Sequence, residues 1–149
     1  MTLHKDYSAF IELLNAAKVE YLIVGAYALA IHGEPRNTGD IDFFISVKPE
    51  NLGKIIRCLE EFGFPSGTFS VEDLERSEVV QVGFAPVRID LLTTLSGIDF
   101  EQAWPNRIER EFGGLPVKLI GLQDFITNKE AVGRPQDLAD AAKARELMQ

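Results

Sequence analysis

The sequence predicts an α/β or α+β fold, in which a mixed β-sheet is flanked by helices and followed by a C-terminal helical pair. Short apolar runs alternate along the chain with amphipathic segments, a pattern typical of strands and helices that build one sheet. Gly and Pro residues separate these segments. No internal repeat, low-complexity tract or interdomain linker divides the 149 residues. We therefore expect a single domain over residues 1–149.

In the first half of the chain, helices are expected where apolar residues recur at helical spacing, and strands where short apolar runs lie between turn residues. The predicted elements, in order, are a helix at Asp6–Lys18 with Asp6 as its N-cap, a strand at Glu20–Val24, a helix at Ala26–His32, a strand at Asp40–Val47 and a helix at Pro49–Phe62. Gly33 and Gly63 stand where the second and third helices should end.

The second half begins with a Gly-, Pro- and Ser-rich loop over residues 63–70. The predicted elements that follow are one helical turn at Val71–Glu75, a hairpin of strands Glu78–Phe84 and Val87–Leu92 joined by Ala85-Pro86, a short helix at Phe100–Trp104, strands at Arg107–Phe112 and Pro116–Ile120 around Gly113-Gly114, and helices at Leu122–Val132 and Pro135–Met148. Gly133-Arg134 separates the last two helices, which form the C-terminal pair.

Composition narrows the class of function. The formal net charge of −8 argues against broad, nonspecific attraction to nucleic-acid phosphates, which depends on Lys and Arg. The single Cys58 excludes an intrachain disulfide and any multi-cysteine metal site, and its place on an apolar helical stripe predicts a buried thiol. The N-terminus lacks the apolar core of a signal peptide, and no apolar run reaches membrane-spanning length. We expect a cytoplasmic protein without membrane contact.

Two carboxylates stand one residue apart at the start of a predicted strand, Asp40 and Asp42. Because a strand alternates its faces, both point the same way, about 6–7 Å apart. The opposite face is wholly apolar and is predicted to be core: Ile41, Phe43, Ile45 and Val47. Carboxylates this close repel one another and raise a pKa unless a cation lies between them. Hard oxygen ligands of this kind suit Mg²⁺ with substrate phosphates, so the pattern indicates metal-dependent phosphoryl chemistry.

A third carboxylate repeats this arrangement on a later strand. In the segment VRIDLL, Asp90 alternates with an apolar face that contains Ile89 and Leu91. If the two strands are neighbours, three carboxylates converge, which is enough to hold two Mg²⁺ ions for a displacement at phosphorus. The alternative is that Asp90 is a solvated residue paired with Arg88.

These residues together resemble the polymerase-beta-like nucleotidyltransferases, and in particular the small bacterial members related to abortive-infection toxins. The family pattern is a strand that ends in Gly-Gly or Gly-Ser, a helix, an Asp-x-Asp strand and a later strand Asp. In this chain it comprises Val24-Gly25-Ala26, then Arg36, Thr38, Asp40 and Asp42, then Asp90, and a C-terminal region with Lys129, Arg134, Asp137 and Asp140. The second turn residue departs from the pattern, because Ala26 keeps a backbone N–H but lacks the hydroxyl of Ser.

The resemblance implies roles for the matching residues. Asp40, Asp42 and Asp90 would be the catalytic and metal-binding carboxylates, holding Mg²⁺, with two ions expected. The residues implied to bind the nucleotide are Gly25, Ala26, Arg36, Thr38 and Lys129. For Arg36 and Lys129 the alternatives are a carboxylate partner and a solvated helix lysine. Arg134 and Asp137 are expected to form an ion pair or cap at the helix junction.

The implied activity is Mg²⁺-dependent transfer of a nucleoside monophosphate from a nucleoside triphosphate, such as ATP, to an acceptor hydroxyl. The acceptor is a protein, an RNA or a small molecule, and the acidic composition favours the protein or the small molecule. Two alternatives stay open. One is an inactive module of the same fold that binds a nucleotide or a partner protein, as in a toxin–antitoxin or phage-defence system. The other is an antibiotic-modifying nucleotidyltransferase.

Overall fold

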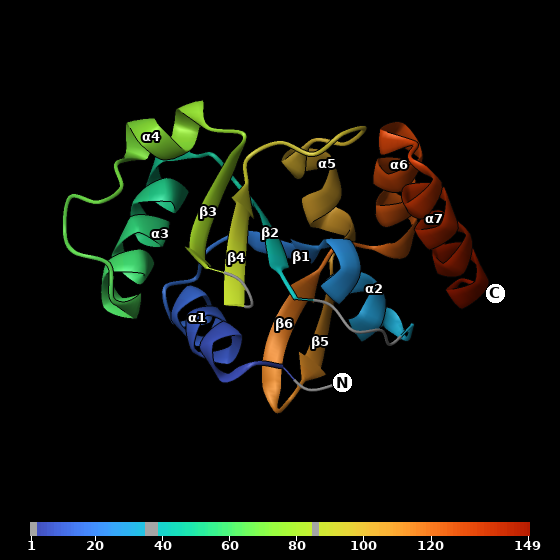
Figure 1. The fold of residues 1–149 in the computed structure, drawn as a ribbon, viewed down its shortest axis with the longest axis horizontal. Coiled ribbons are helices and arrows are strands. Elements are labelled where there is room, and N and C mark those ends of the chain that lie inside the picture. The colour runs from blue at the N-terminus through green and yellow to red at the C-terminus, as the bar shows by residue number, and fades with distance from the viewer. Residues whose placement is uncertain (1–2, 35–38, 85–86) are drawn as a thin grey trace.

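A mixed six-stranded sheet forms the centre of the molecule (Figure 1), for which the computed structural model describes residues 3–34, 39–84 and 87–149. The strands are β1 (Tyr21–Val24), β2 (Ile41–Ile45), β3 (Val79–Phe84), β4 (Val87–Leu92), β5 (Ile108–Phe112) and β6 (Leu115–Leu119). Their order across the sheet is β3-β4-β2-β1-β6-β5. The β2–β4 and β1–β6 pairs are parallel, and the remaining neighbours are antiparallel. The predicted mixed sheet is confirmed.

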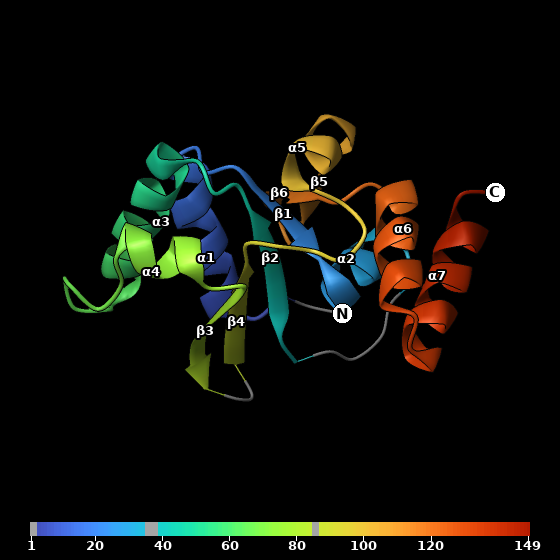
Figure 2. The same ribbon diagram turned by 90° about the horizontal axis from the view of Figure 1, so that it is seen from above.

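Helices cover both faces of this sheet. They are α1 (Lys5–Ala16), α2 (Gly25–His32), α3 (Pro49–Phe62), α4 (Val71–Arg76), α5 (Phe100–Ala103), the 3₁₀ turn η1 (Trp104–Asn106), α6 (Leu122–Val132) and α7 (Pro135–Leu147). Figure 2 shows α1 and α3 on one side, and α2, α6 and α7 on the other. The helices α6 and α7 form the predicted C-terminal pair.

One part of the core lies between the sheet and the α1–α3 layer, and buried residues of α2, α6 and α7 form the other part on the opposite face (Figure 2). Phe10 of α1 contacts Phe43 of β2 edge-to-face, with ring centroids 5.6 Å apart, and Tyr21 of β1 meets the same ring at 5.6 Å. Aromatic pairs in this geometry add to the burial of their apolar surface. Cys58 in α3 belongs to this core, where burial raises the pKa of its thiol to about 11, as expected for an inert cysteine. The odd-numbered residues of β2 are therefore held inward.

The opposite face of β2 carries the carboxylates, and the register of the sheet aligns them. Asp42 is paired with Asp90 of the parallel strand β4 and, on its other side, with Val24 of the antiparallel strand β1. Between β2 and β4 the chain passes through α3, α4 and β3, and α3 lies on the side of the sheet opposite α2, α6 and α7 (Figure 2). The two strands are neighbours, as the three-carboxylate prediction requires.

The structure differs from the sequence prediction at the end of β2 and at the N-cap of α1. Strand β2 ends at Ile45, so Val47 lies beyond it and is 45% exposed instead of buried. The N-cap of α1 is His4 rather than Asp6, because the imidazole Nδ1 of His4 accepts from the backbone N–H of Asp6, which lies in the first turn. The predicted turn at Ala85-Pro86 lies outside the described residues. In the part of the chain that the structure describes, no helix is both long and apolar enough to cross a membrane.

Candidate nucleotide and metal site

The three predicted carboxylates gather on the open face of the sheet, where β2 and β4 run side by side. Asp42 and Asp90 face one another across the parallel pair, and Asp40 immediately precedes β2. Asp90 is nearly buried, with 8% of its surface exposed, whereas the side chain of Asp40 is 37% exposed. The site therefore has one buried carboxylate, Asp90, a partly buried one, Asp42, and a more accessible third carboxylate, Asp40, at its rim.

Arg88 joins two of these groups. It lies two residues before Asp90 on β4, and thus on the same face. Its Nε donates to Asp90 Oδ1 at 3.1 Å, and its Nη2 lies 3.3 Å from Asp90 Oδ2 and 2.5 Å from Asp40 Oδ2. Since Asp40 Oδ2 and Asp90 Oδ2 contact one nitrogen, they cannot be further apart than these two distances combined, and their charges therefore interact strongly. The predicted Asp90–Arg88 pairing and the gathering of carboxylates are both present.

Asp42 has a perturbed carboxyl group. Burial raises the pKa of Asp42 to about 7, and the nearby charge of Asp90 acts in the same direction. Lys129 acts weakly against this rise. No cation among the described residues forms an ion pair with Asp42. A bound cation would stabilise this pair of adjacent carboxylates, because Asp42 is partly buried and has no direct counter-charge in the part of the chain that the structure describes.

The turn between β1 and α2 packs directly against this pair. Gly25 has φ +68°, and a Cβ at this position would lie 2.6 Å from Asp42 Oδ2. Only glycine fits, because the backbone itself approaches the carboxylate. The next residue, Ala26, lies in the first turn of α2, a helix whose N-terminus has no side-chain cap. Free backbone N–H groups therefore lie at this helix end, where they favour a phosphate.

The junction of α6 and α7 forms the basic side of the site. Lys129 Nζ lies 3.4 Å from Asp137 Oδ1, and Arg134 Nε donates to Asp137 Oδ2 at 2.7 Å. Arg134 contributes to the capping of α7, so the expected junction ion pair is present. The side chain of Lys129 is 15% exposed and that of Arg134 is 73% exposed. Two cations thus line the cleft on the side opposite the carboxylates, at the junction of α6 and α7.

Two adjoining cavities occupy the space between these walls. One, of about 780 Å³, lies over the carboxylates and includes Ala26 and Arg88 in its lining. The other, of about 390 Å³, contains Gly25, Lys129 and Asp137. They share four lining residues, Asp42, Val79, Leu92 and Arg134. We call the combined space the carboxylate cleft; each of its two cavities has a volume in the range of small-molecule sites.

The donor set fits a divalent cation of the Mg²⁺ class in part. Asp42 and Asp90 offer adjacent hard oxygen ligands, which such ions prefer. Asp40 is bonded to Arg88 instead, and among the described residues no group of three or more His, Cys, Asp or Glu side chains is arranged to hold a metal ion. The predicted three-carboxylate metal site is therefore not preformed, because a guanidinium lies between two of its members.

Sequence reasoning did not find two residues that position the site. Tyr7 of α1 is 1% exposed, and its hydroxyl accepts from the backbone N–H of Arg88 at 3.1 Å and donates to the carbonyl oxygen of Gly39. Asn128, also buried, donates to the carbonyl oxygen of Ser96 at 3.0 Å and fixes the loop beside Lys129. A tyrosine on an amphipathic helix gives no local signal of such a contact. The predicted residues Arg36 and Thr38 lie outside the described residues.

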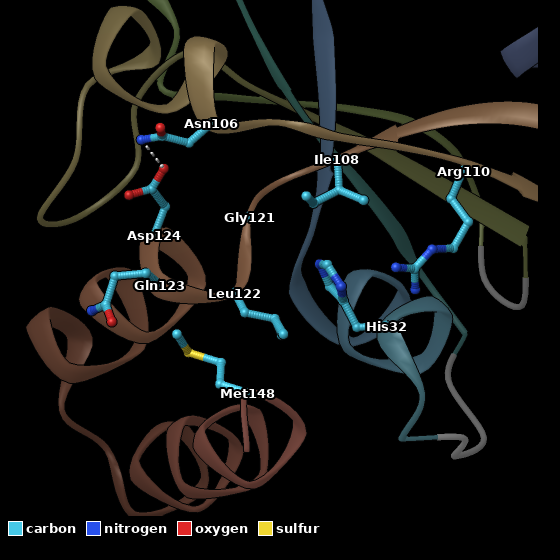
Figure 3. Close-up of a pocket in the computed structure, with 9 residues that line it drawn as sticks. All are labelled: His32, Asn106, Ile108, Arg110, Gly121, Leu122, Gln123, Asp124 and Met148. Atoms are coloured by element: carbon cyan, nitrogen blue, oxygen red, sulfur yellow. Dashed lines mark hydrogen bonds between the residues drawn. The ribbon is translucent and has the colours of Figure 1, made fainter.

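A separate cavity of about 550 Å³ lies at the other ends of α2, α6 and α7 (Figure 3). His32 lies in its wall, and its Nε2 contacts the carbonyl oxygen of Ile120 at 2.7 Å. Burial lowers the pKa of His32, so its imidazole is neutral at pH 7 and donates this hydrogen bond. None of the predicted site residues that the structure describes lines this cavity. The sequence assigned His32 no role, and its contact with Ile120 is structural.

The fold and the carboxylate cleft define the class of protein. The chain matches, over residues 3–148, the model of the family described as nucleotidyltransferase of unknown function (DUF6036), and it belongs to that family. A search of curated proteins finds no match to the chain. The nucleotidyltransferase resemblance drawn from the motifs is therefore confirmed at the level of the family.

Solved structures agree with this assignment at the level of the fold. The lincosamide antibiotic adenylyltransferase LnuA, solved with lincomycin bound, has a TM-score of 0.65 at 15% identity, with 98% of each chain covered. An antigenic nucleotidyltransferase-like protein from Paracoccidioides brasiliensis has a TM-score of 0.59 at 18% identity, covering 94% of this chain and 73% of its own. A putative nucleotidyltransferase from Thermotoga maritima has a TM-score of 0.56 at 16% identity, covering 93% and 88%.

Proposed function

We propose that this chain transfers a nucleoside monophosphate from a nucleoside triphosphate to an acceptor hydroxyl, in the carboxylate cleft. The observation that carries the proposal is the alignment of Asp42 with Asp90 beside the uncapped N-terminus of α2. Gly25 packs against the carboxylate of Asp42, which can hold a cation, and directly precedes the backbone donors of α2, which can bind a phosphate. Phosphoryl and nucleotidyl transfer use both kinds of group, because a carboxylate-bound cation and backbone donors together neutralise and orient the phosphates.

Asp42, Asp90 and Asp40 would hold a divalent cation, taken to be Mg²⁺. When bound, the cation supplies charge neutralisation at the phosphates. The chain's own groups bind and orient the substrate: the N–H groups at Ala26 bind phosphate oxygens, and Lys129 adds a positive charge from the opposite wall. Catalysis then consists of positioning the acceptor oxygen in line with the α-phosphorus, forming the new P–O bond as the bond to pyrophosphate breaks. A cleft carboxylate accepts the proton of the hydroxyl.

A small-molecule hydroxyl is the first acceptor to test. The likeness to an adenylyltransferase that modifies a lincosamide antibiotic motivates this choice, and the net charge of −8 weighs against a polyanionic RNA acceptor. A protein hydroxyl is the second acceptor class. Both acceptor classes fit a cytoplasmic enzyme or a toxin–antitoxin system.

The alternative is an inactive nucleotide- or partner-binding module. It is favoured by Ala26, which lacks the hydroxyl of the family turn, and by the bond between Arg88 and Asp40, which leaves no preformed three-ligand site among the described residues. Against it, the acidic residues of the cleft are all retained, although clustered carboxylates are costly to keep without a cation.

The test is incubation of the protein with each α-³²P-labelled nucleoside triphosphate and Mg²⁺, first with a panel of hydroxyl-bearing antibiotics that includes a lincosamide, then with a cell extract. We expect label in one acceptor with wild type and none with Asp40→Ala. A matched control is Asp73→Ala, which removes an exposed carboxylate from the α4 capping box and leaves the cleft intact. Absence of label in every reaction would favour the inactive module.

A further inference from the structure

Arg88 takes the position between two carboxylates where a metal ion would otherwise find its ligands. Its guanidinium bonds Asp90 through two nitrogens and Asp40 through Nη2. A planar guanidinium that binds carboxylates in this way is held by charge-assisted bonds, which are among the stronger side-chain interactions. As long as these bonds persist, Asp40 and both carboxylate oxygens of Asp90 are engaged by a cation that the chain itself supplies.

The backbone at Arg88 is fixed, so any rearrangement must come from the side chain. The N–H of Arg88 donates to the hydroxyl of the buried Tyr7, and β4 is paired on both of its edges. The Arg88 side chain is nevertheless 31% exposed and lines the larger cavity of the cleft. Space is therefore available for the guanidinium to leave Asp40 without any change in the sheet.

We propose that Arg88 is a built-in counter-ion that competes with the divalent cation for Asp40 and Asp90, so that metal loading requires the guanidinium to leave Asp40. This inference rests on the proposed function and concerns the regulation of the same site. In the resting protein the guanidinium offsets the repulsion among the carboxylates. A nucleoside triphosphate that enters the cleft brings phosphates, which offer the released guanidinium a new anionic partner. Metal and nucleotide consequently bind cooperatively, and metal alone binds weakly.

The competition predicts a definite effect of removing the guanidinium. Arg88→Gln frees both carboxylates, and loss of a unit charge beside a divalent ion strengthens its binding. We expect the Mn²⁺ dissociation constant of the nucleotide-free protein to fall by about tenfold or more. Arg88→Lys keeps a positive charge but lacks the planar fork that spans the two carboxylates, and we expect a smaller fall. Arg134→Gln is the matched control, because Arg134 also lines the cleft but bonds Asp137 instead.

The experiment is calorimetric titration of Mn²⁺ into wild type and the three variants at about pH 8, where carboxylates are ionised, with and without a non-hydrolysable nucleoside triphosphate analogue. The melting temperature of each variant shows that it is folded. The proposal expects tighter Mn²⁺ binding for Arg88→Gln, no such gain for Arg134→Gln, and a nucleotide-induced gain in Mn²⁺ affinity that is larger in wild type than in Arg88→Gln.

Equal Mn²⁺ affinity in wild type and Arg88→Gln, or an equal gain in Arg134→Gln, overturns the role of Arg88 while leaving the proposed function in place if wild type still transfers nucleotide. Weaker Mn²⁺ binding in Arg88→Gln also overturns it, because Arg88 would then support the metal site. If no form of the protein binds Mn²⁺ even with the nucleotide analogue, both this inference and the metal-dependent function fail.

Discussion

Replacing Asp42 by Asn should stabilise the metal-free protein at alkaline pH and have little effect near pH 4. Burial and the charge of Asp90 raise the pKa of Asp42 to about 7 from its ordinary value of 3.8. An acid whose pKa is higher in the folded state binds its proton more tightly there. Its contribution to stability is therefore fully present below the unfolded pKa, and it is lost as the pH rises through the folded pKa. The amide of the Asp42→Asn variant carries no such charge at any pH.

The size of the effect follows from the pKa difference. At about 1.4 kcal/mol per pKa unit, the complete shift corresponds to an upper limit on the order of 4 kcal/mol. The Asp42 carboxyl interacts with Asp90 through charge and through a hydrogen bond, and so part of the shift reflects this pair interaction rather than Asp42 alone. We expect the Asn variant to gain on the order of 2 kcal/mol relative to wild type between about pH 5 and pH 9.

The assay is urea denaturation followed by circular dichroism, in EDTA, for wild type and Asp42→Asn across this range. Glu12→Gln is the control, because Glu12 is an exposed carboxylate on α1, on the opposite side of the sheet. The stability difference between wild type and Asp42→Asn should grow with pH and that for Glu12→Gln should not. A difference that is constant with pH, or an Asn variant that is less stable at about pH 9, would refute the reasoning.

Three further predictions concern groups around the cleft. Gly25→Ala should lower the free energy of unfolding by at least about 1 kcal/mol more than Gly114→Ala, because both positions have positive φ but only a Cβ at Gly25 would meet a carboxylate oxygen. Parallel urea titrations measure the difference, and equal losses would show that the close approach has no effect on stability. Tyr7→Phe should cost about 1–3 kcal/mol by the same assay, since it removes the hydroxyl that accepts from the backbone N–H of Arg88, and an unchanged midpoint would contradict this. Lys129→Met should raise the nucleoside triphosphate dissociation constant by about tenfold in calorimetry. Lys143→Met should not, because the ammonium of Lys143 lies 3.8 Å from Glu34, outside the cleft. Equal effects of the two substitutions would show that Lys129 does not belong to the nucleotide site.

Most of the fold could be predicted from local sequence, because each strand and helix carries its own periodicity and end signals. The alternation in β2 identified which face carries Asp40 and Asp42, and Gly63 and Gly133 marked helix ends that the structure confirms. The predicted strand extended to Val47, whereas β2 ends at Ile45. The alternation of apolar residues continues past the last paired residue, so the local pattern does not show where the pairing stops.

The site was less accessible to sequence reasoning, because its key contacts join distant segments. The alignment of Asp42 with Asp90 depends on the parallel pairing of β2 and β4. The sequence alone did not predict this pairing; it only indicated what would follow if the two strands were neighbours. The bond from Arg88 to Asp40 connects residues that are far apart in the chain, and no spacing rule specifies it. Only the shorter link from Arg88 to Asp90, two residues apart on one strand, was open to prediction.

The central claim is tested most directly by comparing label transfer from α-³²P- and γ-³²P-labelled nucleoside triphosphate in parallel reactions, with the acceptor that the proposed assay identifies. The claim is that the carboxylate cleft carries nucleotidyl transfer. We predict α-label in the acceptor and γ-label in pyrophosphate with wild type, and neither product with Asp42→Asn. Gamma-label in the acceptor, or undiminished transfer by Asp42→Asn, would contradict the account.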